Sequence, residues 1–275
     1  MIGVMQGRLS PPLSAKIQEF PWKSWESEFA TSSKLGINLM EWTLDLYRLQ
    51  ENPLMTEVGQ TRIRDLSTKN KIDIQSVTLD CFVEAPLHRK HFKTGEKSEL
   101  ETFTQIISKA TSVGITIGVL PLVKESGEDD KRTLSDLFLV LGHLEKTCSD
   151  YSFRIALECE FDSKKLKWIA SEVKEMAHVG FNFDIGNSAS IGNDPFEELA
   201  IYGQRLFNIH IKDRVLGGAT VPLGMGSAKF THLAEAIRAL EYSGNMILQA
   251  ARGETGSEME TISRYLKFCD ELGWR

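Results

Sequence analysis

Short runs of apolar residues recur along the chain, and within each run the apolar positions are mostly continuous rather than alternating. A continuous run is typical of a strand that is buried on both faces, as the strands of a parallel sheet are. We therefore predict strands over residues 2–6, 37–42, 72–79, 115–122, 153–157, 179–183, 206–211 and 246–249.

Helical periodicity fills the stretches between these runs. Residues 134–144 repeat leucine and phenylalanine at steps of three and four, and similar stripes occupy 166–176, 233–240 and 259–269. Stripes of this kind are typical of helices that pack one face against a sheet. The regular alternation of strand and helix predicts right-handed crossovers and a parallel sheet.

Eight strand–helix units are the number that closes into a barrel. An open doubly wound sheet has a similar rhythm, but it normally carries a glycine-rich nucleotide-binding turn after its first strand. The segment after the first strand here, residues 6–12, reads QGRLSPP and lacks that pattern. No linker or shift of composition divides the chain. We predict an α/β protein, a single (β/α)8 TIM barrel that spans residues 1–275.

Charge and composition narrow the classes of function. The chain has 32 Lys and Arg against 38 Asp and Glu, a net charge of −6, whereas a nucleic-acid partner requires a basic face. No apolar run approaches the roughly 18 residues that a membrane span needs, and the N-terminus lacks the pattern of a signal peptide. The four cysteines are scattered without a C-x-x-C pair, as in reduced proteins. We expect a cytoplasmic protein with neither a nucleic-acid nor a membrane partner.

Polar residues end most of the predicted strands. In chain order the strand-end residues are Gln6, Glu41, Asp80, Pro121, Glu158, Asp184, His210 and Gln249. In a barrel these ends meet at one mouth, where the active sites of this fold lie. The two carboxylates and the imidazole at 158, 184 and 210, with the amide oxygen at 249, suit one divalent cation, Mn²⁺, Mg²⁺, Co²⁺ or Zn²⁺.

Basic residues gather at the same predicted mouth. Arg8 follows the first strand, Lys212 and Arg214 follow the seventh, and Arg252 follows the eighth. Ion pairs of the strand-end carboxylates with Lys212 or Arg252 are the alternative to a metal. A glycine-rich loop, residues 217–227, leads into a predicted helix, and its N–H groups beside these cations would bind a phosphate or carboxylate of the substrate. The alternative is that these glycines only serve tight turns.

Four motifs carry a family resemblance. They are MQGRLSP at 5–11, DIGN at 184–187, HIKDR at 210–214 and GMG at 224–226. In these motifs, and strand by strand over the whole chain, the sequence resembles the xylose-isomerase-like TIM barrel superfamily, and within it the sugar phosphate isomerase/epimerase group. The resemblance implies a barrel enzyme that acts on sugars with a divalent metal.

The resemblance also implies a set of metal ligands: a Glu, an Asp, a His and a second Glu after strands five to eight. The first three match Glu158, Asp184 and His210, whereas Gln249 stands in place of the second Glu. Glutamine keeps a coordinating oxygen but accepts no proton at neutral pH, so the two-base mechanism of the family's epimerases does not carry over. Asn187 replaces the family's substrate-contacting histidine and still offers an amide to a hydroxyl.

From these observations we expect a metal-dependent isomerase or epimerase of a small sugar or sugar phosphate. It would act through a metal-stabilised enediolate, with Glu158 as the base and Lys212 beside the developing oxyanion. The expected substrate-binding residues are Gln6, Arg8, Glu41, Asn187, Arg214 and Arg252. Two alternatives stay open: a sugar-acid or inosose-type dehydratase, and a barrel that binds a sugar without catalysis because Gln249 replaces a Glu. Assembly into a homo-oligomer also stays open.

Overall fold

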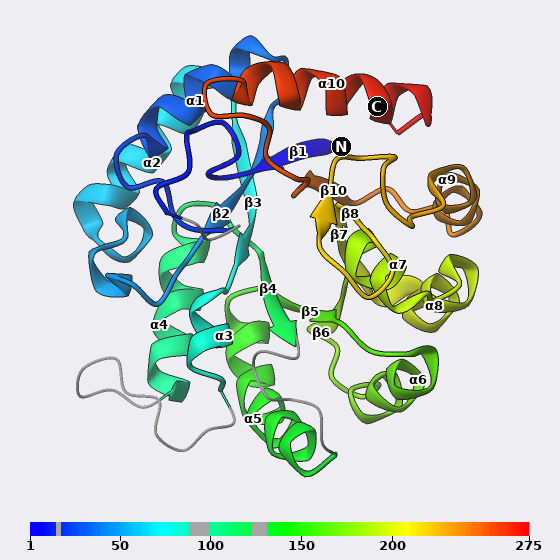
Figure 1. Ribbon diagram of the computed structural model, residues 1–275. Coiled ribbons are helices and arrows are strands. Elements are labelled where there is room, and N and C mark those ends of the chain that lie inside the picture. Colours follow the sequence, from blue (N-terminus) through cyan, green and yellow to red (C-terminus); the bar gives the residue numbers. More distant parts are fainter. Residues whose placement is uncertain (15–17, 88–98, 123–130, 275) are drawn as a thin grey trace.

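A closed barrel of eight parallel strands forms the centre of the molecule in the computed structural model, which describes residues 1–14, 18–87, 99–122 and 131–274 (Figure 1). Around the barrel the strands follow the order β1, β10, β7, β6, β5, β4, β3, β2. Their bounds are β1 (Ile2–Met5), β2 (Leu39–Thr43), β3 (Asp73–Thr78), β4 (Ile117–Leu122), β5 (Arg154–Cys159), β6 (Val179–Asp184), β7 (Leu206–Ile211) and β10 (Asn245–Leu248). Each overlaps one predicted run, so the prediction of a (β/α)8 barrel is confirmed.

Helices surround these strands as an outer layer (Figure 1). They are α1 (Trp25–Lys34), α2 (Glu57–Asn70), α3 (Cys81–Glu84), α4 (Glu99–Thr111), α5 (Lys131–Asp150), α6 (Ser163–Glu172), α7 (Ile185–Ile191), α8 (Pro195–Tyr202), α9 (Phe230–Ala239) and α10 (Glu258–Glu271), with short 3-10 turns at Leu49–Glu51, Pro53–Met55 and Gly203–Arg205. Their apolar stripes are buried against the strands in one large core. In the part of the chain that the structure describes, no helix is both long enough and apolar enough to cross a bilayer.

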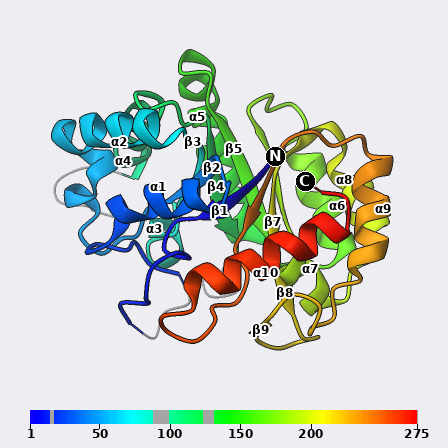
Figure 2. The same cartoon turned by 90° about the horizontal axis from the view of Figure 1, so that it is seen from above.

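A small antiparallel hairpin interrupts the alternation after β7. It pairs β8 (Asp213–Arg214) with β9 (Thr220–Val221) and contacts α7 (Figure 2). The hairpin places the 217–227 loop beside the C-terminal end of β7. The hairpin lies within the connection between β7 and α9 and forms a separate two-stranded sheet, so the strand order of the barrel is unchanged.

The side chains along the barrel axis change from apolar to polar toward the C-terminal ends of the strands. Met5, Leu39 and Ile247 form a small apolar cluster that is separate from the main core. Because side chains two residues apart on a strand share a face, Glu41 lies one layer above Leu39, and Gln249 one layer above Ile247. Strand register therefore decides which polar residues meet above this apolar floor.

Candidate active site

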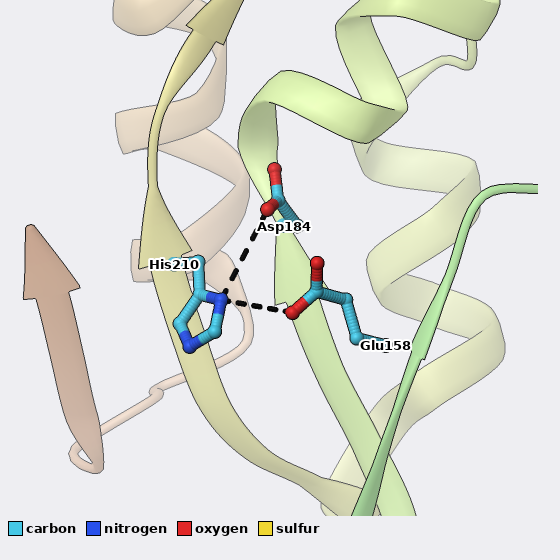
Figure 3. A group of neighbouring side chains, drawn as sticks. All are labelled: Glu158, Asp184 and His210. Carbon is cyan, nitrogen blue, oxygen red and sulfur yellow. Dashed lines mark ion pairs between the residues drawn. The ribbon is translucent and has the colours of Figure 1, made fainter. Parts of the chain in front are cut away.

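Three adjacent strands, β5, β6 and β7, bring Glu158, Asp184 and His210 together at the mouth of the barrel. One carboxylate oxygen from each acid and one ring nitrogen lie within 4.8 Å of one another, and all three residues are buried. His210 Nδ1 is 2.9 Å from Glu158 Oε2 and 3.9 Å from Asp184 Oδ2 (Figure 3). Two carboxylate oxygens and one imidazole nitrogen converging on a point make a donor set that fits a divalent cation.

Gln249, the expected fourth ligand, lies at the C-terminal end of the strand next to that of His210. It follows β10 directly, and β10 pairs with β7 so that Ile247 stands opposite His210. The side chain is 8% exposed, and within the described ranges its Oε1 accepts no hydrogen bond. A buried acceptor without a donor is costly, so this oxygen is suited to a cation or a substrate hydroxyl.

Asp184 is held by the ends of two elements. Its Oδ1 accepts the backbone N–H of Asn187 at 2.8 Å, which caps the N-terminus of α7, and its Oδ2 forms an ion pair with Lys212 Nζ at 2.6 Å. Burial favours the protonated acid, but the cationic Lys212 and His210 outweigh it and hold the pKa of Asp184 below its usual value. The ion pair expected as an alternative thus exists, and it shares the residues of the candidate metal site.

Amide groups orient Glu158. Asn187 Nδ2 donates to Glu158 Oε1 at 3.0 Å, and Asn182 Nδ2 donates to Oε2 at 3.1 Å. The Oδ1 of Asn187 accepts from Arg214 Nη1 at 2.9 Å, and Arg214 also pairs with Glu160 at 3.0 Å. Asn187 and Arg214 were both expected to contact substrate. In the structure they form a chain of hydrogen bonds that ends at the carboxylate of Glu158.

His210 lies between two carboxylates. Its Nε2 is 2.8 Å from Glu41 Oε1, on the side of the ring away from Glu158. Burial disfavours a charged imidazole, but Glu41 and Glu158 outweigh this effect and raise the pKa of His210 to about 10. Glu41 was expected to contact substrate. In the structure its side chain is fully buried and hydrogen-bonded to protein groups.

Two of the arginines hold the loops of the mouth together. Arg8 is buried and its Nε donates to the backbone carbonyl of Ala250 at 3.2 Å. Arg252 Nη1 donates to the carbonyls of Gly7 at 2.6 Å and of Ser10 at 3.0 Å. These contacts connect the segment after β1 to the segment after β10.

The glycine-rich loop already contains its anion. The carboxylate of Asp213 accepts the N–H groups of Gly224 and Gly226, each at 2.9 Å, and that of Ala228 at 3.1 Å. A Cβ on Gly226 would lie 2.2 Å from Asp213 Oδ1, so only glycine allows this approach. These three N–H groups, which include two of the loop expected to bind a substrate anion, thus donate to a buried side chain of the chain itself.

Two further buried polar atoms, on residues that follow β1 and β3, have no hydrogen-bond partner among the described residues. Gln6 Oε1 accepts the N–H of Thr43 at 3.2 Å, but its buried Nε2 donates to no described group. Asp80, after β3, accepts from Thr78 through Oδ1, and its Oδ2 has no such contact. Burial, aided by the charges of Asp45 and Glu158, raises the pKa of Asp80 to about 7 against the opposing Thr78 hydrogen bond.

Sequence reasoning missed the residues that support this site. Asn182 and Asn208 lie inside apolar strands, two residues before Asp184 and His210, and a polar residue within an apolar strand was the available signal. Asp213 is the second residue after β7, between Lys212 and Arg214, and nothing in the local sequence distinguishes its role from theirs.

A family model described as xylose isomerase-like TIM barrel matches residues 29–271. No curated protein matches the sequence significantly.

Solved structures share the fold over the whole chain. A D-psicose 3-epimerase solved in the presence of D-fructose has a TM-score of 0.74 and 14% identity, with 100% of this chain and 99% of that chain covered. A D-allulose 3-epimerase from Methylomonas sp., in complex with D-allulose, has a TM-score of 0.71 and 13% identity over 98% and 96%. A 3-keto-D-glucoside 4-epimerase from E. coli has a TM-score of 0.69 and 16% identity over 98% and 99%.

Proposed function

The chain belongs to the xylose isomerase-like TIM barrel family, and from this we propose that it is a divalent-metal-dependent isomerase or epimerase of a small sugar. One observation carries the proposal: Glu158, Asp184 and His210 present their ligand atoms to a common point at the barrel mouth. The three structural neighbours described above are named for sugar epimerisation, which supports the substrate class.

A divalent cation held by Glu158, Asp184 and His210 would polarise a carbonyl and the neighbouring hydroxyl, and so acidify the proton on the carbon that bears this hydroxyl. Glu158 is the proposed base for that proton. Asn182 and Asn187 fix both of its oxygens, so the carboxylate is oriented before substrate arrives. Lys212, paired with Asp184 and 13% exposed, is the proposed cationic partner of the developing oxyanion.

The identity of residue 249 favours one stereochemical outcome. A glutamine does not take up a proton at neutral pH, so the carboxylate of Glu158 removes and returns the proton on one face of the substrate. Transfer on one face moves a carbonyl between adjacent carbons, whereas inversion at a carbon requires a group on the opposite face. We therefore propose aldose–ketose isomerisation ahead of epimerisation.

The contacts of the glycine-rich loop bear on the proposed substrate. Because Asp213 takes the N–H groups of this loop, they give no support to a phosphate there. Gln6 Nε2, a buried donor, is the group that we propose for a sugar hydroxyl, and Gln249 Oε1, a buried acceptor, is the proposed fourth ligand of the cation. We therefore propose a neutral sugar as the substrate. The alternative to test is a sugar with an anionic group that Lys212 and Arg214 would bind.

The decisive experiment follows deuterium into the substrate. Protein loaded with Mn²⁺ is incubated in D₂O with a panel of aldoses, ketoses and their phosphates, and products are analysed by mass spectrometry. We expect deuterium at one carbon beside the carbonyl, and Glu158→Gln should abolish it while Glu254→Gln, an exposed acid, retains it. Loss of the mass of water identifies a dehydratase instead. Sugar binding with no exchange for any compound refutes the catalytic proposal.

A further inference from the structure

Glu41 is a fully buried carboxylate of the barrel interior, and it contacts both the adjacent strand β3 and the more distant strand β7. It sits on β2, whereas His210 is on β7, and β1 and β10 separate these two strands. Its side chain has no exposed surface. Burying a carboxylate is unfavourable unless its oxygens accept hydrogen bonds. The donors that contact Glu41 therefore indicate the role of this buried carboxylate.

Each oxygen of Glu41 has its own donors. Oε1 lies 2.8 Å from His210 Nε2, while Oε2 accepts Ser76 Oγ at 2.6 Å and Asn208 Nδ2 at 3.0 Å. A carboxylate only accepts, so the contact requires a proton on Nε2. The other ring nitrogen, Nδ1, is then the one that faces Glu158 and Asp184.

The contact between Nδ1 and Glu158 differs in kind from the contact with Glu41. Although Nδ1 lies 2.9 Å from Glu158 Oε2, the two atoms are not aligned for a hydrogen bond, and Nδ1 has no such bond to any described residue. The aligned partner of the ring is therefore Glu41. The other ring nitrogen, Nδ1, lies within 4.8 Å of the oxygens of Glu158 and Asp184, where a cation would take the place of its proton.

Glu41 also reaches Glu158 through amides. Asn208 donates to Glu41 Oε2 and at 2.9 Å to Asn182 Oδ1, and Asn182 in turn donates to Glu158 Oε2. One buried carboxylate thus orients two of the three candidate ligands, the imidazole directly and Glu158 through two amides. An amide at position 41 has a single acceptor oxygen, so it cannot serve both the imidazole and Asn208.

We propose that Glu41 is the positioning residue of the metal centre: it fixes His210 with its proton on Nε2 and so presents Nδ1 to a divalent cation. This inference rests on the metal site of the proposed function and replaces the expected role of Glu41 in binding substrate. A carboxylate or carbonyl behind a metal-binding histidine sets the ring's orientation and raises its basicity, and loss of such a partner typically weakens metal affinity by about 10- to 100-fold.

The first test is metal affinity, which needs no substrate. Calorimetry with Zn²⁺ on metal-free protein compares the wild type with Glu41→Gln, and we expect the variant to bind on the order of 10- to 100-fold more weakly. The matched control is Glu145→Gln, which breaks a similar carboxylate–imidazole contact, 2.8 Å from His178 Nδ1, away from the site. The control should bind Zn²⁺ like the wild type. Equal affinity in Glu41→Gln and the wild type overturns the proposal.

The second test identifies the coordinating nitrogen and depends only on the wild type. In ¹⁵N-histidine-labelled protein loaded with Zn²⁺, long-range ¹H–¹⁵N correlation should show one ring with a protonated Nε2 and a metal-bound Nδ1, absent from His210→Gln. Coordination through Nε2 refutes the role of Glu41, as does a wild type that binds no Zn²⁺. If affinity and spectrum agree with expectation while no sugar exchanges deuterium, the positioning role stands and the proposed sugar chemistry fails.

Discussion

The hydrogen bonds of Asp213 to the glycine-rich loop predict how much stability the loop loses in Asp213→Asn. The carboxylate accepts three backbone N–H groups, two on Oδ2 and one on Oδ1, and it is fully buried. An asparagine offers one acceptor oxygen, so its NH₂ group must face at least one of these N–H donors. A hydrogen bond to a charged acceptor contributes about 1.5–3 kcal/mol, and an orphaned buried donor costs about 1–3 kcal/mol.

We therefore expect Asp213→Asn to destabilise the closed loop by about 2–4 kcal/mol. Native-state hydrogen exchange measures the local stability of the loop. In the variant the amides of Gly224, Gly226 and Ala228 should exchange roughly 30-fold to several-hundred-fold faster than in the wild type. Urea unfolding gives the corresponding global loss.

The matched control is Asp194→Asn at the N-cap of α8. That exposed carboxylate accepts a single N–H, from Glu197 at 3.1 Å, and asparagine caps helices about as well as aspartate. The control should change stability by less than about 0.5 kcal/mol. If Asp213→Asn leaves the three amides as protected as they are in the wild type, the loop is not held by this charge and the reasoning fails.

Three further predictions concern titration, the cation and residue 249. Burial raises the pKa of Glu28 from 4.5 to about 7, even though the N–H groups of Gly7 and Leu9 oppose the shift; the folded state therefore keeps a proton that the unfolded chain releases, and this stability is full below pH 4.5 and is lost as the pH rises through 7. In urea unfolding at pH 5 and pH 8, Glu28→Gln should reduce the difference by up to about 3 kcal/mol, and an unchanged difference contradicts the buried acid. Removing divalent cations with EDTA should lower the melting temperature and Mn²⁺ should restore it, since a ligand that binds only the folded state stabilises it; an identical temperature in both conditions argues against a metal site. Gln249→Glu should tighten Mn²⁺ binding and allow deuterium exchange with inversion, and weaker binding would place residue 249 outside the coordination sphere.

The barrel and the three candidate ligands could be predicted from local sequence patterns. Continuous apolar runs are what strands covered on both faces require, and eight of them alternating with helical stripes leave little choice of architecture. The convergence of Glu158, Asp184 and His210 follows because each ends such a run and the barrel gathers strand ends at one mouth. These inferences depend on local patterns and on one property of the fold.

Which strand-end residues contact protein groups, and which keep an unpartnered polar atom, depends on contacts between distant strands. Glu41 and His210 are 169 positions apart, and their contact depends on the stagger of strands around the barrel, which no local pattern contains. Asp213 likewise acts through a loop that folds back onto it from 11 to 15 residues away. Local sequence reports where a strand ends, whereas the depth of each side chain along the axis is set by the register among all eight strands.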